Sequence, residues 1–290
     1  MALPQVVSAA PLLPPRISLL SAATIIDTDS ERWGNSIAWE PEGCGDNTGV
    51  FDPQCPTGEV TKDVDASCLE ACSGAFVAWA AKTRSTFDLR DKQTGEDLKA
   101  QIERKLLACE SKIIEGEIYT NSLQLCTQAI AATGESFTDL TPGSGAVRPE
   151  VAIAVLEGAL AETNCGQRSM IHVTPFILSR IIALGGFGLL TLVDNVWLTP
   201  TGNAVVPGRG YDGRFPDGSA ATASAEYIYA TSWVAIRRGA VQIYPRDLKQ
   251  AVARSTNDVL FYAERLAVGQ WDPCTHLAIE VDRTACPSCD

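Results

Sequence analysis

Ten cysteines and two histidines are the residues of this chain best suited to holding a metal ion. Cys286-Pro-Ser-Cys289 has the two-residue spacing of a zinc knuckle, and the nearby Cys274-Thr-His276 could donate two further ligands. A closed zinc site needs a second pair with that spacing, and the sequence contains no other Cys-x-x-Cys. The chain is therefore predicted to bind no metal, with a zinc site at these residues as the alternative.

Side chains suited to catalysis form no recognisable pattern. His172 lies in a short apolar stretch, where we expect a structural histidine, and no serine or cysteine nucleophile motif accompanies it. The glycine-rich stretches 185–188 and 207–213 lack the spacing or the lysine of phosphate-binding loops. We therefore expect no catalytic residue and no cofactor-binding residue, and predict that the protein is not an enzyme and has no cofactor.

The other cysteines are interpreted from their surroundings. Cys44 and Cys55 lie in an irregular stretch rich in Gly, Pro, Asp and Asn, which makes them the candidates for a disulfide bond. Cys68 and Cys72 would share one face of a helix or act as small apolar fillers. Cys109 lies on the expected apolar stripe of a helix and is predicted to be in the core.

Composition and charge argue against several classes of protein. The 290 residues are 46% hydrophobic and 20% charged, as in ordinary globular proteins, and the net charge is −12. Clustered cations bind nucleic acids and anionic membranes, so both kinds of dedicated binder are disfavoured. The apolar run 176–198 contains Arg180 and Asp194, which argues against a membrane span. The first residues do not resemble a signal peptide, so we expect synthesis in a reducing cytoplasm.

The longest predicted element is an amphipathic helix at about 95–119. It begins with a capping box, Thr94-Gly-Glu-Asp97, and apolar residues then recur every three or four positions. Before it, residues 1–30 form a proline-interrupted arm that has no core of its own. Residues 31–75 are too many for a plain connection and are expected to be partly β.

The rest of the chain mixes predicted helices and strands. Helices are expected at 151–162 and 176–184. The run 259–268 fits a helix or a strand by periodicity alone. Strands are expected at 75–89, 170–173, 193–198, 204–206, 226–236, 240–244 and 277–281.

This order of blocks resembles the major capsid proteins of tailed bacteriophages, whose Hong Kong 97-like fold is also used by encapsulin nanocompartments. The resemblance is carried by Met170–Pro175, Thr201–Val206, Val234–Tyr244 and Asn257–Leu266. It implies an α+β, Hong Kong 97-like capsid fold with an N-terminal arm, an extended E-loop, a peripheral domain with a long spine helix, and an α/β axial domain. It also implies that 259–268 is a strand.

The same resemblance divides the chain into parts. The expected division is an N-terminal arm at 1–30, an extended E-loop at 31–90, a spine helix of the peripheral domain at 91–129, an axial domain at 130–225, peripheral β-strands at 226–275, and an axial closing strand and tail at 276–290.

The function that the resemblance implies is structural. Subunits would self-assemble into hexamers and pentamers of an icosahedral shell that encloses the genome of a tailed bacteriophage. The protein would be made in the bacterial host cytoplasm and reside in the virion capsid, without a membrane. Its partners would be further copies of itself, a decoration or scaffolding protein and the portal, with DNA enclosed but not bound sequence-specifically. The alternatives are another virion structural protein, such as a decoration or tail component, and an encapsulin-like cellular compartment.

Contact residues between subunits are predicted from their types. Trp33, Trp39 and Phe51 are candidate anchors, because aromatic side chains dominate the energetics of buried interfaces. Arg237 and Arg238 form a lone basic pair, which is expected to be solvated or to make salt bridges between subunits.

Overall fold

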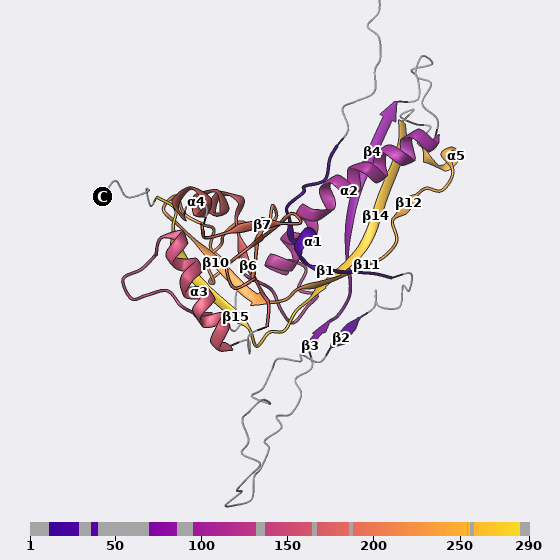
Figure 1. Cartoon of the computed structure of the whole chain (residues 1–290). Coiled ribbons are helices and arrows are strands. Elements are labelled where there is room, and N and C mark those ends of the chain that lie inside the picture. The colour runs from indigo at the N-terminus through magenta and orange to yellow at the C-terminus, as the bar shows by residue number, and fades with distance from the viewer. Residues whose placement is uncertain are drawn as a thin grey trace, which may run out of the picture.

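Two β-sheets and the long helix that joins them dominate the structure (Figure 1). The structure is a computed structural model, and it describes residues 12–28, 36–39, 70–85, 95–131, 137–163, 167–185, 188–253, 255 and 258–284. The larger sheet has seven strands and the other has six, and a separate two-stranded ribbon lies beside them.

The six-stranded sheet is built around one long strand, β14 (Asp258–Gln270). Along one edge it pairs with β4 (Phe76–Ser85) over ten residues. Its other pairings are with β11 (Ala235–Arg238), β12 (Gln242–Tyr244) and β13 (Val252–Ala253). The strand β1 (Thr24–Asp27), which comes from the N-terminal arm, pairs in parallel with β11.

The helix α2 (Gly95–Thr120) covers one face of this sheet. Alternate residues of β14 and β4, among them Phe261 and Ala78, are buried against it, as expected for a sheet with one covered face. The predicted helix at 95–119 is thereby confirmed, and so is the strand at 259–268. Short helices α1 (Leu19–Ala22) and α5 (Leu248–Ala251) lie near the two ends of α2.

The seven-stranded sheet is buried on both faces along its central strands. Helices α3 (Pro149–Thr163) and α4 (Pro175–Gly185) pack on one face, and the opposite face faces the cluster that contains α2. The strands follow the order β5 (Thr138–Asp139), β15 (His276–Asp282), β10 (Ala225–Ser232), β6 (Ser169–Val173), β9 (Ala204–Pro207), β8 (Val196–Leu198) and β7 (Thr191–Val193).

Two predicted strands are each divided in the structure. The stretch 226–236 supplies β10 to one sheet and β11 to the other, with a break at Trp233 and Val234. The stretch 193–198 contains a hairpin turn, at which Asp194 and Asn195 take positive φ angles. Polar residues lie at or just before each interruption, Thr231 and Ser232 in the first stretch and Asp194 and Asn195 in the second, but the prediction treated each stretch as one strand.

The small ribbon pairs β2 (Ile37–Trp39) with β3 (Glu70–Cys72), and a disulfide links Cys72 to Cys126. Cys72 therefore lies in a strand and is covalently bonded, so its interpretation as a helical residue or apolar filler was wrong. Cys109 is free and exposed on α2, and its predicted place in the core was also wrong. Cys44 and Cys55, the predicted disulfide candidates, lie outside the described residues.

The disulfide generates the first prediction. The double substitution of Cys72 and Cys126 to alanine should lower the free energy of unfolding by about 2–4 kcal/mol, because the bond closes a long loop in the unfolded chain. Urea unfolding of unassembled subunits would measure this change. Cys109→Ser is the matched control and should leave the free energy unchanged, whereas equal stability of the double variant would contradict the prediction.

Candidate subunit-assembly site

A buried carboxylate lies where the arm, the long helix and the seven-stranded sheet meet. The side chain of Glu115, on the inner face of α2, is completely buried. Its Oε1 accepts hydrogen bonds from the backbone N–H of Leu19 at 2.8 Å and from the hydroxyl of Ser111 at 2.9 Å. Its Oε2 accepts from the N–H groups of Arg209 at 2.6 Å and Gly210 at 3.2 Å. One side chain thus connects the arm, α2 and the loop after β9.

The loop after β9 lies directly on the helix backbone at this point. A Cβ atom added at Gly210 would come within 2.3 Å of the Gly116 nitrogen and 2.5 Å of the Lys112 carbonyl oxygen. Only glycine lets the two backbones approach this closely. The contact brings the Arg209 and Gly210 N–H groups within reach of Glu115.

Two opposing effects act on the Glu115 carboxyl group. Burial disfavours the charged form and raises its pKa above the ordinary value, and the four hydrogen bonds lower it in part. All four partners are donors, which is the arrangement that a carboxylate requires. The surrounding segments therefore supply the hydrogen bonds that the buried charge would otherwise lose with water.

A second acidic side chain of α2 joins the arm strand to the six-stranded sheet. Glu110 is buried and accepts hydrogen bonds from Nη1 of Arg265 on β14, at 3.0 and 3.3 Å. Arg238 on β11 lies 3.6 Å from the same carboxylate, and its Nε donates to Asp27 of β1 at 3.0 Å. Because Asp27 lies opposite Arg238 in the strand pairing, the ion pair reinforces the register of the arm strand.

Behind Glu115 lies a buried cluster of tyrosine and histidine side chains. The rings of Tyr119 and Tyr211 stack with centroids 4.6 Å apart. His172 is hydrogen-bonded through Nδ1 to the Tyr211 hydroxyl at 3.0 Å and through Nε2 to the Thr231 hydroxyl at 2.9 Å. Burial lowers the pKa of His172 to about 3, so the imidazole is neutral in the folded protein. The expectation that His172 is structural agrees with this environment.

Comparisons with known proteins identify the fold. No family model matches the sequence, and no curated protein matches it. The capsid of an empty GTA particle is similar in structure over 97% of this chain and 95% of that chain, with a TM-score of 0.58 and 13% sequence identity. The holo-SrpI encapsulin complex from Synechococcus elongatus PCC 7942 is similar over 98% of both chains, with a TM-score of 0.57 and 10% identity. The chain has the Hong Kong 97-like capsid fold.

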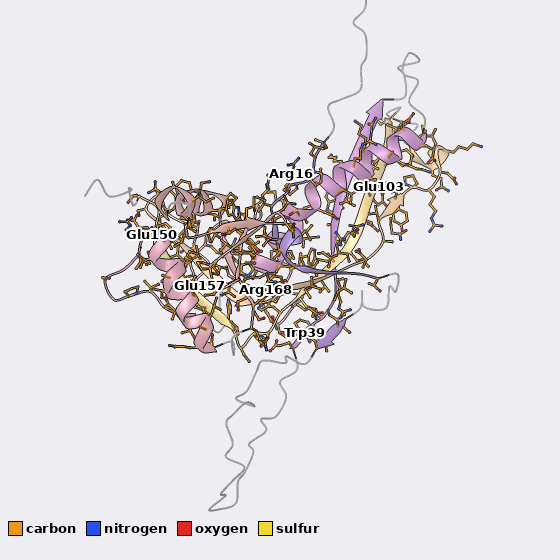
Figure 2. The ribbon with its side chains drawn as sticks, in the orientation of Figure 1. Arg16, Trp39, Glu103, Glu150, Glu157 and Arg168 are labelled. Carbon is orange, nitrogen blue, oxygen red and sulfur yellow. A yellow bond between two sulfur atoms is a disulfide. The ribbon has the colours of Figure 1, made fainter. Side chains whose placement is uncertain are left out.

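Three of the predicted contact residues of this capsid fold make bonds within the chain. Trp39 donates from Nε1 to the Trp271 carbonyl at 3.2 Å, and Arg237 donates from Nε to Gln270 at 2.9 Å. Arg238 makes the ion pairs described above. Trp39 lies on β2, well away from Arg16 of the arm (Figure 2). Their contacts with other subunits remain predictions, and Trp33 and Phe51 lie outside the described residues.

Neither a metal site nor a membrane-spanning helix is found among the described residues. No group of three or more His, Cys, Asp or Glu side chains there could hold a metal ion. His276 is hydrogen-bonded to the Ile130 carbonyl and Cys274 is disulfide-bonded, so this pair is not the set of zinc ligands that the alternative required. Among these residues, no helix combines the length and apolar character needed to cross a membrane.

The buried acidic residues of α2 were missed by the sequence analysis. The predicted stripe included Cys109, whereas the buried face includes Glu110, Ser111 and Glu115. The sequence did indicate that Glu110 lies on the buried face, since it follows Ile102 and Leu106 at intervals of four residues. The prediction instead placed Glu110 and Glu115 on the solvent-facing side of the helix.

Replacing the central carboxylate should weaken the junction. In Glu115→Gln, an amide NH₂ group would face backbone N–H donors, so at least one buried donor would lose its acceptor. We expect the free energy of unfolding to fall by about 1–3 kcal/mol in urea titrations of unassembled subunits. Hydrogen exchange of the Leu19 amide should also become faster. The exposed Glu103 provides the control, and a Glu115→Gln variant as stable as Glu103→Gln would contradict the prediction.

His172 should make the fold sensitive to acid. Between the ordinary pKa of 6.5 and the folded value of about 3, the unfolded chain binds a proton that the folded chain does not, so stability falls as pH falls. His172→Gln should reduce the slope of the unfolding free energy against pH, by an amount that corresponds to about one bound proton. Tyr211→Phe removes a hydrogen bond but keeps the titrating group, so it should lower stability and retain the slope. An unchanged slope in His172→Gln would refute this assignment.

Proposed function

We propose that the protein is the subunit of an icosahedral shell, formed from its hexamers and pentamers, that encloses the genome of a tailed bacteriophage. The observation that carries the proposal is the extent of the structural similarity to two shell-forming chains. It covers at least 95% of this chain and of each of those chains. A capsid match of TM-score 0.50 over 96% of this chain, to the cyanophage P-SCSP1u, adds support. The proposed role is structural and not enzymatic.

The exposed apolar side chains support self-association. Four of them share one surface, the uncovered face of the six-stranded sheet. Apolar side chains that gather on a surface commonly mark contacts with other proteins. The members of this surface are Val77, Trp79, Leu260 and Tyr262, and the other exposed large apolar side chains of the described residues are Leu12, Leu13, Leu123, Val151, Phe176, Ile182, Leu192, Val193 and Leu248.

The parts of the subunit would have distinct tasks in this shell. Residues 1–30 would act as the N-terminal arm and 31–90 as the E-loop, while 91–129 would brace the peripheral strands at 226–275. Residues 130–225 and 276–290 would form the axial domain. Pairing of β1 with β11, together with the packing of α2 on β14 and β4, supports this assignment.

We further propose the partners and location that accompany such a shell. Trp33, Trp39, Phe51, Arg237 and Arg238 would contribute contacts between copies, and a decoration or scaffolding protein and the portal would bind the assembly. The chain would be made in the host cytoplasm and reside in the virion. The net charge of −12 favours enclosing DNA without sequence-specific binding, because phosphates are not attracted to an acidic wall.

A cellular compartment is the second candidate. The similarity to the encapsulin has nearly the same TM-score as that to the GTA capsid, and it covers 98% of each chain. The two candidates share self-assembly and differ in contents, since one encloses a genome and the other a protein cargo.

Assembly of the purified chain tests the shell proposal. At rising concentration and salt, we expect closed particles, or pentamers and hexamers, in negative-stain images and light scattering. A monodisperse monomer under every condition would refute shell formation. In particles isolated from the native source, nuclease-protected DNA would support the bacteriophage and a co-purifying enzyme without DNA would support the compartment.

A further inference from the structure

A disulfide bond is unexpected in a chain for which we expect synthesis in a reducing cytoplasm. Cys72 and Cys126 are bonded to each other, although they are 54 residues apart in sequence. Disulfides form and persist in oxidising surroundings and are rare in proteins that remain in the cytosol. The bond between these two cysteines is therefore expected to form after the chain has left the compartment in which it is made.

The two cysteines are brought together by backbone pairing as well as by the covalent bond. Residues 125–127 lie beside β3 as an additional antiparallel strand, in which Cys126 is opposite Cys72. Hydrogen bonds of 2.5 and 2.9 Å flank this pair, from the Ser73 N–H to the Leu125 carbonyl and from the Thr127 N–H to the Ala71 carbonyl. Because these bonds align the two residues, a chain with free thiols can hold the same geometry.

The surroundings of Cys72 suit a thiol as well as a disulfide. Its side chain is completely buried, and its Sγ lies 3.9 Å from the carbonyl oxygen of Gly269 on β14. A thiol at this position has a weak S–H donor and an acceptor within its reach, whereas a disulfide has no proton to donate. Free cysteine also behaves as a small apolar side chain in a core. Both oxidation states therefore fit the same packing.

The two cysteines differ in their access to solvent, which sets the order of the chemical steps. Cys126 is partly exposed and Cys72 is completely buried, so a small disulfide from solvent reaches Cys126 first. The Cys126 thiolate attacks one sulfur of that disulfide, forms a mixed disulfide and releases one thiol. The Cys72 thiolate then attacks the Cys126 sulfur and displaces the second thiol. One external disulfide is reduced to two thiols, which carry the two protons, and the two protein thiols are oxidised to one disulfide.

The bond attaches the β2–β3 ribbon to the end of α2. Asn121, the residue after α2, accepts through Oδ1 from the N–H groups of Leu125 and Cys126, at 3.1 and 3.3 Å, and its Nδ2 donates to the Cys126 carbonyl at 2.7 Å. On the other side of the bond, Cys72 lies in β3, which pairs with β2. These two strands flank residues 40–69 in the sequence. Oxidation therefore fixes, by a covalent bond, the place where residues 40–69 begin and end.

We propose that Cys72 and Cys126 form a redox-sensitive link, which is open as two thiols while subunits assemble and is closed after release by exchange with a low-molecular-weight disulfide. The closed link holds the ribbon against the end of α2. In the open state noncovalent contacts alone hold it there, so the ribbon separates from α2 more readily. This inference rests on the proposed assembly and location of the protein, and it assigns a control to the base of the proposed E-loop at 31–90.

Thiol mapping tests when the link closes. The chain would be expressed in a bacterial cytoplasm, and cells would be lysed in urea with N-ethylmaleimide and analysed by mass spectrometry. We expect label on Cys72 and Cys126 in this sample, and none after intact particles have been released and treated with oxidised glutathione. Cys109 is free and exposed, so it should be labelled in the blocked lysate and serves as the internal control. A bond already closed in the blocked lysate, or full labelling of both thiols after treatment, would overturn the proposal.

Hydrogen exchange separates this inference from the assembly proposal, because it needs only the unassembled chain. Oxidised glutathione should slow exchange of the Ser73 and Thr127 amides about tenfold, since the closed link suppresses local opening. The Ile228 amide in β10 should be unaffected. The Cys72→Ser/Cys126→Ser double variant should lose the response, whereas the matched control Cys109→Ser should keep it. Equal exchange in reduced and oxidised wild-type chain, or a response retained by the double variant, would overturn the link even if shells form.

Discussion

The arrangement of this subunit depends on satisfying one buried negative charge. A carboxylate removed from water is very unfavourable unless hydrogen-bond donors replace the lost solvent. Glu115 obtains its donors from three segments that are far apart in sequence, namely the arm at Leu19, the helix at Ser111 and the loop at Arg209 and Gly210. Each segment must be in place for the charge to be tolerated, so this residue favours one arrangement of the arm and both sheets over other compact arrangements.

The second acidic residue extends this constraint across the six-stranded sheet. Glu110 lies between Arg265 and Arg238, and Arg238 also binds Asp27 of the arm strand. A slip of β1 along β11 would separate Asp27 from Arg238. The arm is therefore fixed at two points by α2, directly through Glu115 and indirectly through Arg238. The long helix α2 holds the arm in position because its buried face carries charged residues as well as apolar ones.

Periodicity predicted the elements better than their contacts. The helix at 95–119 and most short strands were predicted because apolar spacing reports which face of an element is buried. The same method misplaced Cys109, since the buried face of α2 is completed by charged residues whose partners lie far along the chain. The bond between Cys72 and Cys126 and the division of 226–236 between two sheets also depend on distant neighbours. The resemblance to capsid proteins added what spacing could not, the assignment of 259–268 as a strand.

The two fixed points also explain why the chain leaves apolar surface uncovered. Because Glu115 fixes Leu19 beside α2, the exposed Leu12 and Leu13 extend from a defined origin. The exposed aromatic residues of the six-stranded sheet are held on the face opposite α2 by the alternation of β14 and β4. In the structure of the single chain, Leu12, Leu13 and Trp79 are all left exposed. In the proposed shell, other copies would cover such apolar side chains, and a repeated contact between copies closes into rings or shells when the rotation between subunits permits.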